Sequence, residues 1–234
     1  MQGWCKSMPG KSKNPAPVTL LLLYASMFVE WDEIEAAMCL LIQLDTYMRP
    51  TAAIELRWSS VVIPFGALGG LGSADSSVNK WAFVLGNSDL GETTKSGTID
   101  DTVLLGTDTR DFIVDVWERY AEKYYADGAR IFPGLTLSKY EKLFTKAGKL
   151  SNTAALHVTP HVVRHTAPSH DFLVGSRTIP EIKARGQWAH DASVRRYQQS
   201  GRLLLQSQKL SAAQVQLCTR ASASLFDAIL TAID

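Results

Sequence analysis

The strongest constraint on the fold of this chain is a change in hydrophobic spacing in the middle of the sequence. Three short runs, at 60–64, 81–85 and 102–105, are rich in β-branched or aromatic residues, whereas the flanking segments repeat apolar residues at helical spacing. Gly, Ser, Asn and Asp bound these runs, which is typical of strands in a small antiparallel sheet. The sequence therefore predicts a mainly α fold with a small three-stranded antiparallel sheet, an α+β class.

Helical spacing and helix-start signals predict where the helices lie around this sheet. Asp32 with Glu35, and Ser138 with Glu141, have the spacing of a capping box, and each pair precedes apolar residues at helical spacing. Pro168 is expected to kink the helix that contains it. The expected helices are 20–29, 34–44, 50–56, 112–128, 138–150, 160–173, 179–187, 191–198 and one that begins after Ser211.

The glycine-rich stretch 66–72 matches no phosphate-loop motif and is expected to be a flexible hairpin loop. Composition favours a globular chain, because 46% of the 234 residues are hydrophobic and 20% are charged, which excludes a disordered or low-complexity chain. Three cysteines, far apart in sequence, fit free thiols in a reducing compartment.

One apolar run, 18–29, follows Lys11 and Lys13 in the manner of a signal peptide. The run has about 12 residues, and a helix that spans a bilayer needs roughly 20. We therefore expect a buried first helix, a soluble intracellular protein and no membrane partner.

The net charge of +1 hides an uneven distribution of charge along the chain. Eight Lys and Arg stand against three acidic residues in 157–209, whereas 27–47 carries five acidic residues and no basic one. The basic part could therefore lie against phosphates.

Three histidines at spacing four resemble a metal site: His157, His161 and His165. A proline interrupts their helix, and no nearby Cys or Glu completes the site. We therefore expect no metal.

Six residues follow one another in an order that is more informative than any single motif. The first arginine stands in TYMRPTAAIELRW, a lysine in TTKSG ahead of the third strand, and a His-x-x-Arg motif in PHVVRH. A tryptophan in RGQWAHD is followed nine residues later by a tyrosine in SVRRY. In type, order and approximate spacing, this set resembles the catalytic domain of the tyrosine recombinases, the phage-integrase family, over roughly residues 17–200. The six residues are Arg49, Lys95, His161, Arg164, Trp188 and Tyr197.

The resemblance implies a reaction at a DNA phosphodiester. Arg49 and Arg164 would neutralise charge on its non-bridging oxygens, because guanidiniums offer bidentate donors and keep their protons. Tyr197 would attack phosphorus to give a 3′-phosphotyrosine and a free 5′-hydroxyl. His161 would act as a base or proton relay, and Lys95 would protonate the leaving 5′ oxygen.

The same resemblance implies that Trp188 holds the phosphate and packs the site. It implies site-specific DNA recombination or integration, as in mobile elements, with no cofactor. The expected partner is double-stranded DNA, on which the chain would form a homotetramer in the nucleus or nucleoid. Residues expected to bind DNA are Lys183, Arg185, Arg195 and Arg196.

Departures from the family pattern leave two alternative functions open: an inactive DNA-binding relic and a type IB topoisomerase-like DNA-relaxing enzyme. Ala52 stands where the family usually has an acidic residue, and Glu55, one helical turn further, is an imperfect substitute. The expected organisation is a flexible lead-in at 1–16, a catalytic domain at 17–200 and a tail at 201–234. The family's N-terminal DNA-clamping domain is expected to be absent.

The tail carries Leu217, Ala221, Leu225 and Ile229 at spacing four, which predicts an amphipathic helix. In the resembling family, the segment after the tyrosine often packs on a neighbouring protomer. The apolar stripe of this tail could do the same or could fold back on its own domain, and the sequence leaves both arrangements open.

Overall fold

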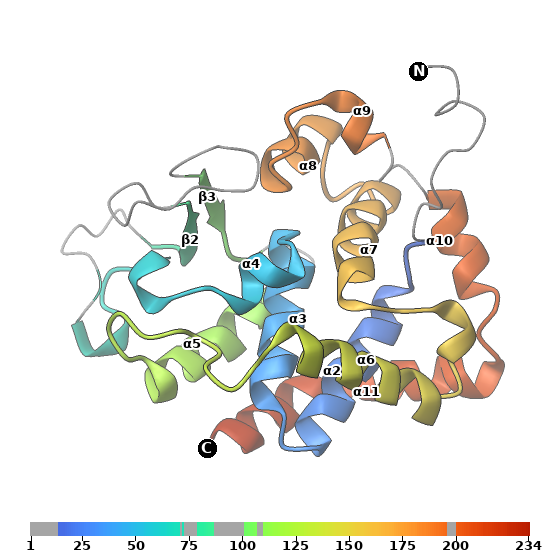
Figure 1. Ribbon diagram of the computed structural model, residues 1–234, viewed down its shortest axis with the longest axis horizontal. Helices are drawn as coiled ribbons and strands as arrows, with labels where there is room; N and C mark the ends of the chain where they lie inside the picture. Colours follow the sequence, from blue (N-terminus) through green and yellow to red (C-terminus); the bar gives the residue numbers. More distant parts are fainter. Residues whose placement is uncertain (1–13, 71, 73–78, 87–100, 107–109, 196–199) are drawn as a thin grey trace.

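Helices make up most of the protein, and a small sheet lies to one side of them (Figure 1). The central helix is α3 (Ile34–Thr46), in which every residue from Ala36 onward is buried. α2 (Val18–Glu30) precedes α3 and packs against it. The computed structural model describes residues 14–70, 72, 79–86, 101–106, 110–195 and 200–234.

A tight turn joins α2 to α3. Asp32 has a left-handed backbone conformation with φ 60°, and Glu33 is the N-cap of α3, without a side-chain capping bond. The carboxylate of Glu35 accepts a hydrogen bond from the Gly134 N–H at 2.9 Å. The capping box predicted at Asp32 and Glu35 is therefore wrong, because Glu35 binds a segment that is distant in sequence.

The predicted three-stranded antiparallel sheet is confirmed. Its strands are β1 (Val61–Val62), β2 (Ala82–Leu85) and β3 (Asp101–Leu104), and β2 is in the middle. The ring of Phe83 in β2 packs edge-on against Trp117 of the following helix, with the ring centroids 5.2 Å apart. This contact joins the sheet to the helical core.

Shorter helical segments flank β1, and a longer helix follows the sheet. α4 (Pro50–Ile54) has its proline in the first turn, where an N–H has no helical partner to lose. η1 (Trp58–Ser60) precedes β1, and η2 (Leu68–Gly70) forms a single turn in the glycine-rich stretch. α5 (Phe112–Tyr124) ends before Gly128, which has a left-handed φ of 69°.

The next helices lie at their predicted places but differ in detail. α6 (Leu137–Leu150) begins after Thr136, whose hydroxyl accepts a hydrogen bond from the Lys139 N–H at 3.2 Å. The capping box predicted at Ser138 is therefore wrong, since the helix begins earlier. After η4 (Ala154–Leu156), α7 (Pro160–Leu173) includes the buried Pro168 within its length.

α8 (Ile179–Arg185) and α9 (Asp191–Val194) follow α7 near their predicted places. α10 (Ser200–Ser207) is a helix that the sequence reasoning missed. α11 (Ala212–Ile233) begins with a capping box in which Ser211 and Gln214 bond each other's backbone N–H.

α11 crosses the bottom of Figure 1 and packs along α2 and α5. Ala221, Leu225 and Ile229 are buried, as expected for the apolar stripe of the tail. Leu217 is 38% exposed, and the neighbouring Cys218 is buried in its place. The stripe is thus covered by the helices of its own chain.

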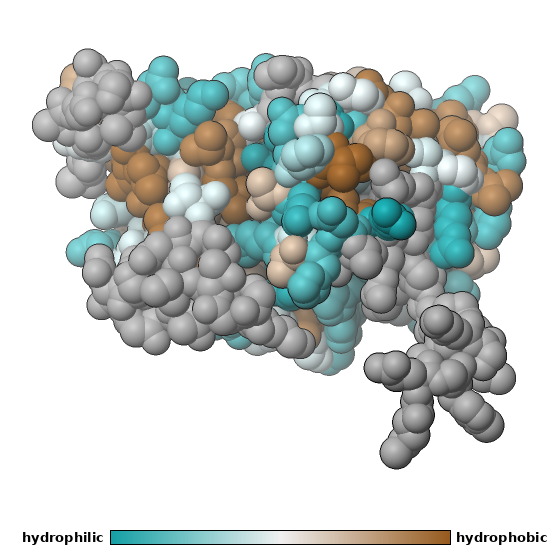
Figure 2. Space-filling view, turned by 90° about the horizontal axis from the view of Figure 1, so that it is seen from above, coloured by the Kyte–Doolittle hydropathy of each residue, from teal (hydrophilic) through white to brown (hydrophobic). Residues whose placement is uncertain are grey.

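Figure 2 looks down on the face that carries the sheet, α8 and α9. Hydrophilic residues occupy the middle of this face, and hydrophobic residues lie on both sides of them. No helix within the described ranges is long and apolar enough to cross a bilayer. Cys39 and Cys218 are buried free thiols, whereas Cys5 lies outside the described residues.

Candidate active site

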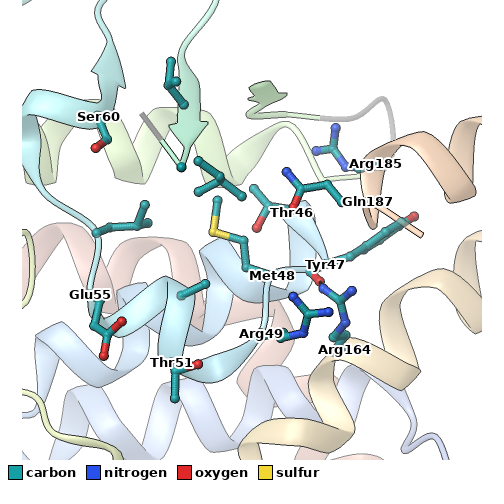
Figure 3. Close-up of a pocket in the computed structure, with 15 residues that line it drawn as sticks. Thr46, Tyr47, Met48, Arg49, Thr51, Glu55, Ser60, Arg164, Arg185 and Gln187 are labelled. Atoms are coloured by element: carbon teal, nitrogen blue, oxygen red, sulfur yellow. Dashed lines mark hydrogen bonds between the residues drawn. The ribbon is translucent and has the colours of Figure 1, made fainter. Parts of the chain in front are cut away.

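A cavity of about 410 Å³ lies where the α3–α4 junction, the end of β2, α7 and the end of α8 meet (Figure 3). Apolar side chains, among them Leu56, Val84 and Leu85, form part of its wall. The polar part of the wall includes Arg49 and Arg164, which are far apart in the sequence. The fold therefore brings two of the six predicted site residues to one cavity.

Arg49 is held at the cavity by the local chain geometry. It is the N-cap of α4, with φ −67° and ψ 148°, the extended conformation that a following proline favours. Its side chain is half-buried and lies beside that of Arg164 (Figure 3). Among the described residues, the Arg49 guanidinium makes no hydrogen bond or ion pair, so its donors are directed at the cavity without a protein partner.

Arg164 projects from α7 and is held at several points. Its Nη1 donates a hydrogen bond to the backbone carbonyl of Tyr47, and its Nη2 donates to the Gly186 carbonyl at 2.8 Å. The guanidinium carbon lies 4.8 Å from the centroid of the Trp188 ring, a cation–π contact. These contacts fix the plane of a guanidinium that is only 8% exposed.

Glu55 does not compensate for Ala52 in this site. Its exposed side chain also lines the cavity, at the opposite end of α4 from Arg49 in Figure 3, and the described residues include no ion pair between Glu55 and Arg49. Glu55, the imperfect substitute for the missing acidic residue, thus lines the cavity but makes no ion pair with Arg49 in the described part of the chain. Two guanidiniums therefore lie at one cavity wall, and positive charges so placed favour the binding of an anion.

Gln187 adds another donor to the same cavity. Its Nε2 is buried and has no hydrogen-bond partner among the described residues. A buried amide N–H without a partner is unfavourable, and an anion oxygen in the cavity would satisfy it. Gln187 has a left-handed φ of 54°, which turns the chain directly before Trp188.

A buried ionic network lies behind the two cavity arginines. Arg110 donates two hydrogen bonds to the Asp171 carboxylate, each 2.7 Å long, and its Nε lies 3.6 Å from Asp45 Oδ1. Asp45 Oδ2 accepts a hydrogen bond from Arg185 at 2.7 Å. Arg177 Nε lies 3.5 Å from Asp171. Three network arginines thus surround two carboxylates.

The network keeps the Asp171 carboxyl ionised. Burial by itself would raise its pKa, but hydrogen bonds from His170, Arg110 and Tyr47 and the charge of Arg110 outweigh burial and lower the pKa well below 3.8. Sequence reasoning missed Asp45, Arg110 and Asp171. The signal in the sequence was an acidic residue within an otherwise apolar helical segment, as at the end of α3.

The other predicted catalytic residues are not all at the cavity. His161 is exposed in the first turn of α7, three residues before Arg164, and does not line the cavity. Trp188 is buried, and its ring packs on Arg164 and stacks with Tyr47. Lys95 and Tyr197 lie outside the described residues, in the segments that join β2 to β3 and α9 to α10.

Two of the residues expected to bind DNA have acidic partners in the structure. Lys183 Nζ lies 2.6 Å from Asp191 Oδ1, and Arg185 is buried against Asp45. Arg195 is exposed at the end of α9, and Arg196 lies outside the described residues. Of the four, Arg195 is thus the described residue whose side chain is exposed to solvent, with Asp191 as a nearby acidic residue.

The three histidines at spacing four do not share one helix face. His157 ends η4 in a left-handed conformation with φ 50°, whereas His161 and His165 lie in α7. The described part of the chain contains no group of three or more His, Cys, Asp or Glu side chains placed to hold a metal ion.

Comparison with models of protein families, with curated proteins and with solved structures found no match to this chain. The functional argument therefore depends on the chemistry of the cavity. Fixed guanidinium and amide donors facing one space can bind a tetrahedral oxyanion and stabilise additional charge on it.

Proposed function

We propose that this protein is a DNA strand transferase of the tyrosine-recombinase type, which acts through a 3′-phosphotyrosine intermediate. The observation that carries the proposal is that Arg49 and Arg164, paired in the sequence pattern, lie side by side at one cavity. The mainly α fold with its three-stranded sheet is compatible with the integrase catalytic domain, which is the finer fold that we propose.

In this mechanism the cavity binds the phosphodiester that is cut. Charge on the non-bridging oxygens increases as phosphorus becomes five-coordinate, and the two guanidiniums stabilise that charge. The Gln187 amide supplies a further donor, which the sequence pattern did not include. Binding of the phosphate also relieves the repulsion between Arg49 and Arg164.

Tyr197 is the proposed nucleophile. Its oxygen forms a bond to phosphorus, the bond to the 5′ oxygen breaks, and His161 accepts the phenol proton while Lys95 protonates the leaving oxygen. Attack by a 5′-hydroxyl reverses these steps and rejoins the strand. The phosphotyrosine link retains the energy of the original bond, so the reaction needs no cofactor.

The proposed partner is double-stranded DNA, bound by a homotetramer in the nucleus or nucleoid. Arg195, exposed at the end of α9, is the described candidate for a direct phosphate contact outside the cavity. Lys183 and Arg185 remain proposed contacts, and each would have to exchange an existing carboxylate partner for a phosphate.

Covalent trapping on nicked DNA tests the proposal. A library of duplexes of randomised sequence, each nicked so that a short 5′-hydroxyl fragment is lost after cleavage, should accumulate a protein–DNA adduct that resists denaturing electrophoresis. Tyr197→Phe should abolish the adduct while DNA affinity stays within about twofold, because the phenol oxygen is the attacking atom. Tyr124→Phe is the matched control, since Tyr124 is partly exposed on α5 and should leave the adduct unchanged.

Three results would contradict the proposal. An adduct that persists in Tyr197→Phe would place the nucleophile elsewhere. DNA binding by the wild-type chain without any adduct across the library would favour an inactive DNA-binding protein. Relaxation of supercoiled plasmids of arbitrary sequence, without strand exchange, would favour a topoisomerase-like enzyme.

A further inference from the structure

We infer that Tyr47 is a positioning residue for Arg164: the bond from its hydroxyl to the buried Asp171 fixes the backbone carbonyl that orients the Arg164 guanidinium. This inference rests on the proposed function, in which Arg164 stabilises the transition state. The sequence pattern assigned no role to Tyr47 or Asp171.

Tyr47 joins the ionic network to the cavity. Its backbone carbonyl accepts a hydrogen bond from Arg164 Nη1, and its hydroxyl donates one to Asp171 Oδ2. Its ring is stacked with that of Trp188, with centroids 6.4 Å apart and planes inclined by 22°. Trp188 in turn packs against the guanidinium of the same arginine, so Tyr47 and Trp188 contact both Arg164 and each other.

The backbone of Tyr47 is in a conformation that a large side chain rarely adopts. It ends α3 with φ 59° and ψ 21°, the left-handed region in which glycine is unstrained. A tyrosine at such a position needs contacts that hold it there, and such positions are often found at functional sites. The bond to Asp171 and the stacking on Trp188 are these contacts.

Asp171 is itself held rigidly. Arg110 binds it through two parallel hydrogen bonds of 2.7 Å, and the residue is fully buried. Burial, followed by the negative charge of Asp171, raises the pKa of Tyr47, so the phenol stays protonated and donates to an ionised carboxylate. A hydrogen bond between a phenol and a carboxylate is among the stronger ones in proteins.

Loss of this bond should affect the reaction more than the binding of DNA. Without it the Tyr47 ring remains stacked on Trp188, but the carbonyl that accepts from Arg164 is no longer tied to the network. A small rotation of the guanidinium reduces its interaction with the charge that develops in the transition state. Ground-state contacts along the DNA backbone are made elsewhere and should persist.

Tyr47→Phe removes only the hydroxyl, and Tyr24→Phe is a matched control. Tyr24 is also buried, and its hydroxyl makes a 2.8 Å hydrogen bond to Thr153, away from the cavity. In single-turnover cleavage of nicked DNA, Tyr47→Phe should lower the rate about tenfold and leave the Kd for DNA within about twofold. Because each variant loses one buried hydroxyl, Tyr24→Phe and Tyr47→Phe should lower the Tm by similar amounts. Tyr24→Phe should leave the cleavage rate unchanged.

Binding of inorganic phosphate, measured by calorimetry, tests the same inference without the reaction. Tyr47→Phe should weaken phosphate binding about threefold or more, and Tyr24→Phe should not. In an Arg164→Ala background, Tyr47→Phe should cause no further loss, because its effect passes through Arg164. Asp171→Asn, which weakens the same bond from the other side, should change phosphate binding in the same direction when it is measured well below the lowered Tm of that variant.

The two proposals fail in different ways. If the wild-type chain forms no adduct, the proposed function fails and the phosphate measurements decide the role of Tyr47. If Tyr47→Phe cleaves DNA and binds phosphate as the wild type does while its Tm falls like that of Tyr24→Phe, Tyr47 has a purely structural role and the inference is overturned. A further loss of phosphate affinity in the Arg164→Ala background would also overturn it.

Discussion

Replacement of Asp171 by Asn should strongly destabilise the fold, because this carboxylate is the centre of the buried ionic network. Asp171 is fully buried and accepts hydrogen bonds from Arg110 and Tyr47. Asn keeps the shape of the side chain but removes its charge and replaces one acceptor oxygen with a donor. The amide then faces the guanidinium of Arg110, which is itself only 4% exposed.

The magnitude follows from what Arg110 loses. Its remaining acidic neighbour is Asp45, 3.6 Å from Nε. Removing one partner of a buried ion pair costs about 3–5 kcal/mol, because a charge stays buried without compensation. Since single domains are stable by about 5–15 kcal/mol, the variant should lose a large part of its free energy of unfolding. For a chain of this length the Tm should fall by roughly 6–20 °C.

The pH dependence of stability tests the electrostatic origin of this loss. The pKa of Asp171 is lower in the folded protein than in the unfolded chain, where it is near 3.9. Its contribution is therefore fully present above about pH 5 and is lost as the pH falls through the folded-state pKa. The stability difference between the wild type and Asp171→Asn should accordingly be constant from about pH 5 to 7 and shrink below about pH 4.

Urea unfolding followed by tryptophan fluorescence and circular dichroism measures both quantities. Asp191→Asn is the matched control, because Asp191 is exposed and pairs with Lys183 at the surface. Exposed pairs contribute little, so this variant should unfold almost as the wild type does. A loss of stability for Asp171→Asn that is no larger than that of the control, or that does not change with pH, would refute the reasoning.

Two further predictions concern DNA binding and the tail. Arg49→Ala should weaken DNA binding similarly for all sequences and reduce the slope of log K against log salt by about 1. Fluorescence anisotropy between about 50 and 200 mM salt measures this slope. Arg119→Ala, at an exposed position on α5, should leave the slope unchanged. Leu225→Ala should lower the free energy of unfolding by about 2–5 kcal/mol in urea, because Leu225 is 1% exposed between α11 and the core. Leu217→Ala, at a 38% exposed position, should cost much less, and equal losses would contradict the observed packing of α11.

The positions of most helices and strands could be predicted because they depend on local spacing. The three short runs rich in β-branched and aromatic residues form β1, β2 and β3, and 160–173 is helical as predicted. Local signals failed where a side chain had a distant partner. Glu35 binds Gly134 and takes no part in a capping box, and Thr136 caps α6 ahead of Ser138.

The arrangement of the site could be predicted only in part. The sequence pattern paired Arg49 with Arg164, and the structure places both at one cavity. The pattern did not predict that Arg185 pairs with Asp45, nor that Asp171 binds Tyr47 and Arg110. These partners come from separate elements, and no local spacing encodes which charged residues meet when those elements pack.

The sequence by itself determined which segments become helix or strand, because backbone preference and apolar periodicity act over a few residues. Only the tertiary structure decided which buried charges compensate each other, and it covered the stripe of α11 with α2 of the same chain. These pairings contribute large free energies because the groups are buried. A carboxylate or guanidinium that is removed from water is costly unless a neighbouring group in the fold compensates its charge. Arg110 and Asp171 pair for this reason, whereas Arg49 and Arg164 lie at the wall of the cavity.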